Sequence, residues 1–319
     1  MKHVLKSPFP YFGGKRKIAA EIWKRFGAVD NYVEPFFGSG AVLLARPEPF
    51  STETVNDADG LLSNFWRALQ TDPEAVATFA DWPVNENDLH ARHSWLVGQK
   101  DSLQAKLEGD PDYFDAKMAG WWVWGMACWI GSGFCSGNGP WQVADVDGFR
   151  QLVHLGNDGH GVNRQLVHLG GGRGVNRKRV DLLNYFNQLA DRLHDVRVCC
   201  GDWSRVCGPS VTFKHGITAV LLDPPYADTA KRHATLYRID SESVAHSVRE
   251  WAIKQGDNPL MRIALCGYEG EHQMPQDWLI ESWNAGEGFG SQADARTNNG
   301  KKERIWFSPH CLNPEPRLL

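Results

Sequence analysis

Apolar positions follow two different periods along the chain, and each period predicts regular structure. Short apolar runs bounded by glycine, aspartate or proline are typical of strands buried on both faces of a parallel sheet. Five segments fit this pattern: Asn31–Phe36, Glu53–Asn56, Thr218–Leu222, Met261–Leu265 and Arg304–Phe307. Helix-like patterns or turns follow the first three. The sequence therefore predicts an α/β fold with a Rossmann-like, doubly wound and mostly parallel sheet.

The middle of the chain carries helical patterns. Residues 87–107 predict a helix with Asn87 or Asp88 near its N-cap. Met118–Ile130 is apolar on all sides, which predicts a buried helix, and its 13 residues are too few to span a bilayer. A glycine-rich loop follows at Gly131–Gly139. The first residues lack the apolar stretch of a signal peptide.

Charge is distributed unevenly along the 319 residues, whose net charge of −4 gives no support for nucleic-acid binding. Residues 71–117 hold ten acidic and four basic residues, whereas residues 150–180 hold six basic residues and one acid. Within the basic segment, residues 150–163 and 164–176 are near copies that both begin RQLVHLG. Two copies are too few for a solenoid. The composition predicts a mobile or extended basic arm, and a passive loop made by local duplication fits it equally well.

Cysteine and histidine spacing argues against metal sites. The seven cysteines include no CxxC pair, which predicts reduced thiols, no disulfide framework and a cytoplasmic location. His90 and His93 lie three residues apart with no evident third ligand. We therefore interpret them as part of a solvated helix face and predict no metal.

A glycine turn follows the first predicted strand. Gly38 and Gly40 lead into an apolar helix start, an arrangement that lets a nucleotide approach the backbone and the helix N-terminus. Leu43 occupies the third glycine position of the dinucleotide fingerprint, and no GxxxxGK[ST] occurs. These departures disfavour NAD and the phosphate loop of nucleotide triphosphatases.

Asp57 ends the second predicted strand, 19 residues after Gly38. An acid at this distance is placed to bind ribose hydroxyls. A cofactor with ribose but no pyrophosphate fits both observations, and S-adenosylmethionine is such a cofactor. As an alternative, Asp57 or Asp59 caps the helix that the pattern Leu61–Leu69 predicts.

The segment Asp223-Pro224-Pro225-Tyr226 ends a buried strand, where open α/β sheets bind ligands. The two prolines make the turn rigid. It presents the Asp223 carboxylate, the Pro224 carbonyl and the Tyr226 ring. Two acceptors and one flat ring suit a planar base with an exocyclic amine.

These motifs, in this order, resemble the Dam-type, D12 class of N6-adenine DNA methyltransferases. Four segments carry the resemblance: Pro10–Lys15, Glu34–Gly40, Cys200–Trp203 and Asp223–Tyr226. Trp203 replaces the Phe of a Cys-x-Asp-Phe motif, and Tyr11 replaces a frequent Trp. Leu265–Tyr268 and Glu303–Trp306 are weaker echoes. The resemblance implies a methyltransferase catalytic domain at residues 1–69 and 191–319. Residues 70–190 would form an inserted, helical and loop-rich target-recognition region that includes the 150–176 repeat.

The resemblance also implies roles for the matching residues. Asp57 should hold the ribose of S-adenosylmethionine and Asp202 should accept from its adenine amine. The full set of expected cofactor contacts is Tyr11, Lys15, Glu34, Phe37, Gly38, Gly40, Asp57, Asp202, Trp203 and Asp223. Asp223, Pro224 and Tyr226 should hold the target adenine, which must flip out of the duplex to be methylated at N6.

Double-stranded DNA is the partner that this activity implies, with no membrane and a monomer or weak dimer as the expected assembly. The expected DNA contacts are the six basic residues of the 150–180 segment within the insert: Arg150, Arg164, Arg173, Arg177, Lys178 and Arg179. The Arg and Gln of the repeat can also read guanine and adenine edges. Cytosine N4 methylation, protein glutamine methylation and an inactive DNA-binding relative remain alternatives. Restriction-modification, phage self-protection and regulation remain open as biological roles.

Overall fold

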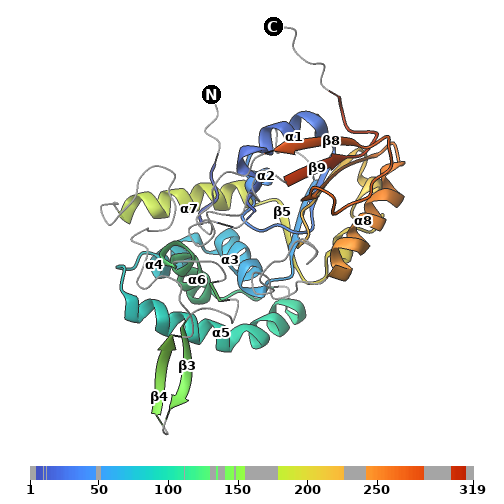
Figure 1. Ribbon diagram of the computed structural model, residues 1–319. Helices are drawn as coiled ribbons and strands as arrows, with labels where there is room; N and C mark the ends of the chain where they lie inside the picture. Colours follow the sequence, from blue (N-terminus) through green and yellow to red (C-terminus); the bar gives the residue numbers. More distant parts are fainter. Residues whose placement is uncertain are drawn as a thin grey trace.

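Seven strands form one sheet in the order β5-β2-β1-β6-β7-β9-β8 (Figure 1). The computed structural model describes residues 5–9, 11, 13–47, 52–110, 112–129, 134–135, 141–146, 149–154, 179–225, 242–283 and 303–313. The sheet strands are β1 (Asn31–Glu34), β2 (Thr52–Asp57), β5 (Val196–Cys200), β6 (Thr218–Leu222), β7 (Met261–Tyr268), β8 (Leu279–Trp283) and β9 (Glu303–Phe307).

Most of the sheet is parallel. Strands β1, β2, β5, β6 and β7 pair in parallel, and β9 runs antiparallel between β7 and β8. The predicted α/β fold with a mostly parallel sheet is therefore confirmed, and all five predicted strands are present. Strand β1 ends at Glu34 rather than Phe36, because Pro35 has no N–H to donate to the ladder. Strands β5 and β8 were not predicted.

Both faces of the sheet are buried, as expected for central parallel strands. Along β6, Ala219 and Leu221 belong to one apolar cluster, while Val220 and Leu222 belong to another. The first cluster includes side chains of α1 to α7, and the second includes side chains of α8. In Figure 1, α3 to α7 gather on one side of the molecule and α8 lies on the other.

The helices are α1 (Ala19–Phe26), α2 (Ala41–Leu44), α3 (Gly60–Thr71), α4 (Pro73–Ala80), α5 (Glu86–Gly109), α6 (Ala116–Cys128), α7 (Arg179–Leu193) and α8 (Glu242–Gly256). Short 3-10 turns are η1 (Lys15–Lys17), η2 (Trp203–Val206) and η3 (Phe213–His215). Among the helices that the structure describes, none has both the length and the apolar character that crossing a bilayer would need.

Side-chain caps fix where the middle helices begin. Asn85 caps α5 by accepting from the N–H groups of Asn87 and Asp88, so the predicted cap residues lie inside the first turn. Asp115 caps α6 through the N–H of Met118. The α6 side chains are largely buried, which confirms the prediction for the tryptophan-rich segment.

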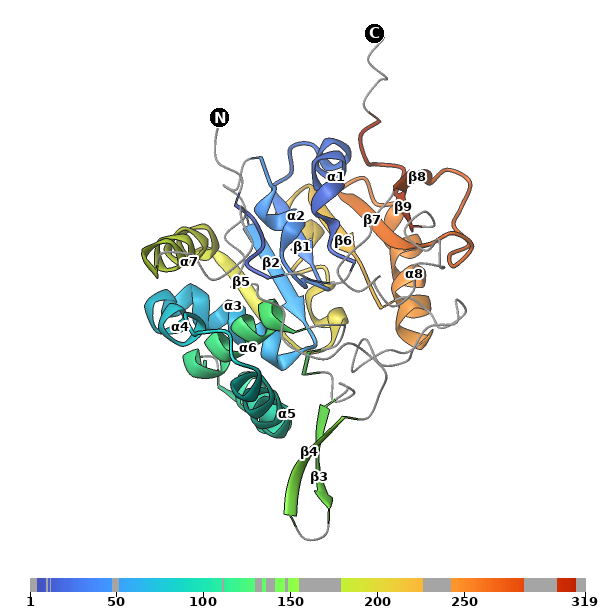
Figure 2. The same cartoon turned by 60° about the vertical axis from the view of Figure 1, so that its left-hand side comes forward.

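A two-stranded hairpin projects beyond α5 (Figure 2). It pairs β3 (Trp141–Val146) with β4 (Phe149–His154) in antiparallel register. Strand β4 contains the first residues of the first repeat copy, so this part of the predicted arm is extended backbone within a hairpin. The rest of the repeat lies outside the described residues.

Candidate active site at the carboxyl edge of the sheet

The strand order reverses between β1 and β6. From β1 the chain continues outward through β2 and β5, and from β6 it continues the other way through β7. In open α/β sheets, ligands bind beside the carboxyl ends of the strands at such a switch point. Three acids lie at this edge: Glu34 ends β1, Asp57 ends β2, and Asp223 follows β6.

The glycine turn after β1 is held in one conformation by its neighbours. Gly38 and Gly40 have φ angles of +50° and +67°, which other residues rarely adopt. A Cβ on Gly38 would also lie 2.7 Å from the Tyr11 ring. The Gly38 N–H donates to Asp57 Oδ2 at 3.0 Å, and Trp66 Nε1 donates to the Gly38 carbonyl at 3.0 Å. The turn is therefore preorganised.

Asp57 connects the turn to the start of α3. Its Oδ1 accepts from the Asp59 N–H at 2.9 Å, while Asp59 itself caps α3 through the Leu61 N–H. Burial raises the pKa of Asp57 to about 6, although the N–H groups of Asp59 and Gly38 act in the opposite direction. Of the two candidate cap residues, Asp59 is the cap.

The partly exposed Asp223 forms an ion pair with the buried Lys15. Lys15 Nζ lies 2.7 Å from Asp223 Oδ2, donates to the Gly13 carbonyl at 2.8 Å, and lies 3.9 Å from Glu303 Oε2. The Lys15 side chain is only 3% exposed. Burial alone would lower the pKa of Lys15, but Asp223, Cys266 and Glu303 outweigh it and raise the pKa. Lys15 therefore remains a cation at this edge.

Glu34 is a buried acid close to Asp223. It accepts from the Tyr32 hydroxyl at 2.8 Å. Burial raises the pKa of Glu34 well above its ordinary value, and the nearby Asp223 and Asp57 carboxylates raise it further. Burial therefore acts against a negative charge on Glu34.

Two aromatic rings flank the end of β5. Trp203 stacks against Phe36 with centroids 6.3 Å apart and ring planes at 26°, and both side chains are partly exposed. Asp202 is exposed and caps η2 through the Ser204 N–H. Phe37 points into the core and packs against Trp66 at 5.1 Å. The sequence predicts Phe37 as a cofactor contact, and the structure places Phe37 in the core and its neighbour Phe36 at the partly exposed surface.

The structure thus brings Tyr11, Lys15, Glu34, Gly38, Gly40, Asp57 and Asp223 to one edge, and their cofactor roles stay predictions. Pro224 is buried beside them. Several predicted residues lie outside the described part of the chain: Tyr226, Arg164, Arg173, Arg177 and Lys178. Arg150 lies in β4 and Arg179 begins α7, and only their backbone is described.

The interpretation of His90 and His93 as a solvated helix face is wrong. Both are about 5% exposed, and His93 stacks on Trp129 with centroids 4.8 Å apart. Burial lowers the pKa of His93 to about 4, with His90 and Lys100 acting in the same direction. Within the described residues, no three His, Cys, Asp or Glu side chains are grouped to hold a metal ion. All seven cysteines are described, and all are free thiols.

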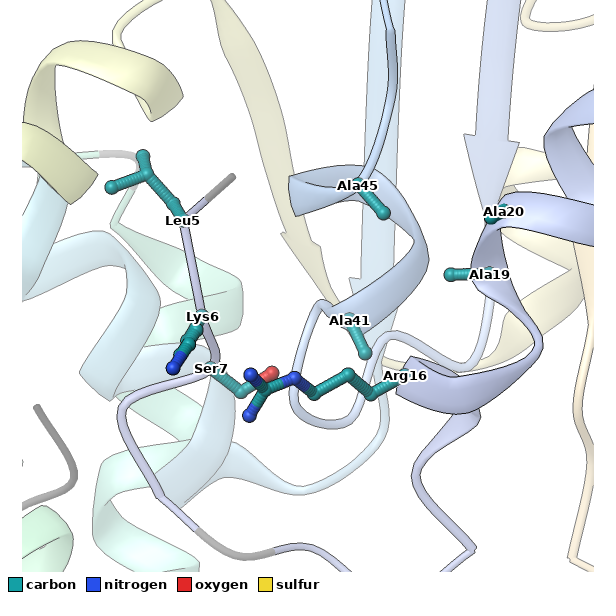
Figure 3. A pocket seen from close by; sticks show the side chains of 8 residues that line it. All are labelled: Leu5, Lys6, Ser7, Arg16, Ala19, Ala20, Ala41 and Ala45. Carbon is teal, nitrogen blue, oxygen red and sulfur yellow. The ribbon is translucent and has the colours of Figure 1, made fainter. Parts of the chain in front are cut away.

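A cavity of about 250 Å³ lies between the N-terminal segment, α1 and α2 (Figure 3). The Arg16 side chain extends toward Ser7 across it, and Ala41 and Ala45 contribute the α2 wall. None of the predicted site residues lines this cavity.

Comparison with known proteins gives a family match for the N-terminal part of this edge. Residues 11–91 match the model of the D12 class N6 adenine-specific DNA methyltransferases, so a domain of that class is detected in this segment. The matched residues include the glycine turn, Lys15, Glu34 and Asp57. No curated protein matches the chain. Members of that class are adenine-specific DNA methyltransferases, which are transferases that act on DNA.

Proposed function

We propose that the carboxyl edge of the sheet binds S-adenosylmethionine beside β1 and β2 and a flipped-out adenine beside β6. S-adenosylmethionine supplies an electrophilic methyl group carried on a sulfonium. The observation that carries this proposal is the convergence of the glycine turn, Asp57 and Asp223 at the switch point of the sheet. The matched D12 class domain contains the first two of these elements.

The residues present suit the cofactor in both charge and shape. The preorganised turn at Gly38 keeps a side chain out of the space next to Asp57, whose carboxylate can accept ribose hydroxyl protons. The partly exposed Phe36 and Trp203 rings provide apolar surface for a purine. Asp202 beside them can accept from an exocyclic amine. We include Phe36 in the proposed site and give Phe37 a supporting role in the core.

Asp223 is the proposed acceptor for the target amine. A carboxylate has two oxygens and about four lone-pair sites, so the Lys15 contact to Oδ2 leaves acceptor capacity. Hydrogen bonds from the adenine amine to Asp223 and the Pro224 carbonyl would favour a pyramidal nitrogen with its lone pair aimed at the methyl group. The carboxylate would also stabilise positive charge as it develops on that nitrogen. Stacking of the flipped base is assigned to Tyr226, which lies outside the described residues.

Residues 70–190 are the proposed target-recognition region, and the catalytic domain would comprise residues 1–69 and 191–319. The described hairpin β3–β4 supports this proposal, because a two-stranded ribbon projects away from the helices (Figure 2). A two-stranded ribbon is one of the elements that fit the major groove. The basic residues of the 150–180 segment would contact phosphates. The free thiols suit a reducing compartment such as the cytoplasm.

A methyl-transfer assay tests the function directly. Purified protein is incubated with isotopically labelled S-adenosylmethionine and double-stranded DNA, and the digested nucleosides are identified by mass spectrometry. We expect N6-methyladenine from the wild type and none from Asp223→Ala, because that variant lacks the acceptor for the amine. Asp195→Ala removes an exposed carboxylate and serves as the control.

Three results would contradict the proposal. Near-normal methylation by a folded Asp223→Ala variant would remove Asp223 from the chemistry. Label in N4-methylcytosine would favour the cytosine enzyme, and binding of DNA without any methyl transfer would favour an inactive relative.

A further inference from the structure

The geometry points to Glu303 as a positioning residue that acts through Lys15 on Asp223, an inference that rests on the proposed function. Glu303 begins β9, which is the one antiparallel strand of the sheet that pairs with β7. Because β9 runs in the opposite direction, its first residue lies at the carboxyl edge of the parallel strands. There Glu303 pairs with Tyr268 of β7 and Trp283 of β8.

The Lys15 ammonium lies near two carboxylates, the partly exposed Asp223 and the buried Glu303. Its Nζ is 2.7 Å from Asp223 Oδ2 and 3.9 Å from Glu303 Oε2, and the Glu303 side chain is only 6% exposed. Both carboxylates raise the pKa of Lys15. The Trp283 ring, with its centroid 5.7 Å from Nζ, closes another side of the ammonium. Glu303 is therefore part of the same buried electrostatic network as the proposed catalytic acid.

The spacing indicates what Glu303 contributes. A buried charge without a partner is costly. If Asp223 were the only carboxylate near Lys15, the ammonium would therefore hold Asp223 tightly and compete with the adenine amine for it. The second carboxylate keeps Lys15 compensated when Asp223 turns toward the amine. Glu303 thereby makes Asp223 available to substrate while Lys15 continues to fix its position.

Two variants separate charge from shape at this position. Glu303→Gln keeps the shape and loses the charge, whereas Glu303→Asp keeps the charge and shortens the side chain. We expect kcat to fall about tenfold in Glu303→Gln, less than the roughly hundredfold or greater loss typical of removing a direct electrostatic contact. The Asp variant should retain more activity than the Gln variant. KM for S-adenosylmethionine should change little, since Glu303 acts through Lys15.

Glu281→Gln is the matched control. It neutralises a carboxylate on the adjacent strand β8 that pairs with Arg25 of α1 instead of Lys15. This control should keep the wild-type kcat. A role for Glu303 in shape alone predicts the reverse order, with Gln tolerated and Asp impaired. That order, or an unchanged kcat in Glu303→Gln, would overturn the inference while the proposed function stands.

A measurement without catalysis tests the same contact. In protein labelled with ¹⁵N-lysine, the Lys15 ammonium resonance is assigned through its loss in Lys15→Arg. The resonance should shift in Glu303→Gln and stay in place in Glu281→Gln. An unchanged Lys15 resonance in Glu303→Gln would overturn the inference even if the wild type proved inactive on DNA. Failure of the wild type to methylate adenine would instead contradict the proposed function.

Discussion

Replacing Asp57 by alanine should separate cofactor binding from stability. The side chain accepts from the backbone N–H groups of Gly38 and Asp59, at 3.0 and 2.9 Å. If it also holds the ribose, the variant loses a charge-assisted hydrogen bond worth about 1.5–3 kcal/mol. That loss corresponds to a roughly tenfold to 150-fold weaker affinity for S-adenosylmethionine.

The effect on the free energy of unfolding should be much smaller, because removing the buried charge stabilises the protein and losing the backbone hydrogen bonds destabilises it. The pKa of Asp57 rises from 3.8 to about 6. At about 1.4 kcal/mol per pKa unit, ionised Asp57 destabilises the native state by up to about 3 kcal/mol at neutral pH. Alanine removes this term but leaves two backbone N–H groups without their acceptor, at about 1–3 kcal/mol each. We therefore expect little net change in the free energy of unfolding at pH 7.

The pH dependence has a definite sign. Below pH 3.8 Asp57 is protonated in both the folded and unfolded states, and its ionisation has no effect on stability. The unfavourable contribution appears as pH rises through 3.8 and is complete above about 6. From pH 5 to pH 8 the alanine variant should therefore gain about 1.4 kcal/mol relative to the wild type.

Calorimetric titration with S-adenosylmethionine and urea unfolding at both pH values check these expectations. Asp59→Ala is the control: it removes the α3 cap, so it should lose about 1 kcal/mol of stability and keep its cofactor affinity. Unchanged affinity in Asp57→Ala would exclude Asp57 from the site. Destabilisation beyond about 3 kcal/mol would instead make support of the glycine turn its main role.

Two further predictions concern the scaffold and the DNA. Glu53→Gln should destabilise the protein by about 3–5 kcal/mol in urea unfolding, because it leaves the buried Arg46 and the partly buried Arg192 without their carboxylate. Glu21→Gln breaks an exposed ion pair and should change stability by about 0.5 kcal/mol or less, and a similar effect at both sites would contradict this reasoning. Neutralising three basic residues of the insert should reduce the salt slope of DNA binding by about one unit per charge. The residues to change are Arg173, Arg177 and Arg179, and an unchanged slope would make the repeat a passive loop.

Local pattern was enough to predict the central strands and the acids at their ends. Strand β6 has five buried apolar or small residues, and β1 ends in a glycine turn, so both patterns are strong. The outer strand β8 is mostly exposed and has no apolar run. It forms because β9 gives it a partner, and a partner 20 residues away leaves no local signal. The same holds for the Lys15–Asp223 ion pair, which joins residues 208 positions apart.

Burial of polar side chains was the least predictable feature. His90 and His93 occur in a charged helix, and their spacing gives no indication that Trp129 covers them. The different burial of Phe36 and Phe37 was unpredictable for a related reason. The adjacent Phe36 and Phe37 rings pack against different apolar clusters. Phe37 is the ring that packs against Trp66 of α3, a contact that the local sequence does not indicate.

The antiparallel strand β9 has a consequence for the order in which the protein becomes active during synthesis. Chains emerge from the ribosome N-terminus first, and early segments can begin to fold before later ones exist. Lys15 precedes Glu303 and β9 by 288 positions, so it is synthesised well before them. Until β9 inserts between β7 and β8, the carboxyl edge lacks one of its two carboxylates around Lys15. A nascent chain that lacks β9 would thus carry the glycine turn and Asp223 without the second carboxylate beside Lys15, and under the proposed function it should transfer methyl groups more slowly.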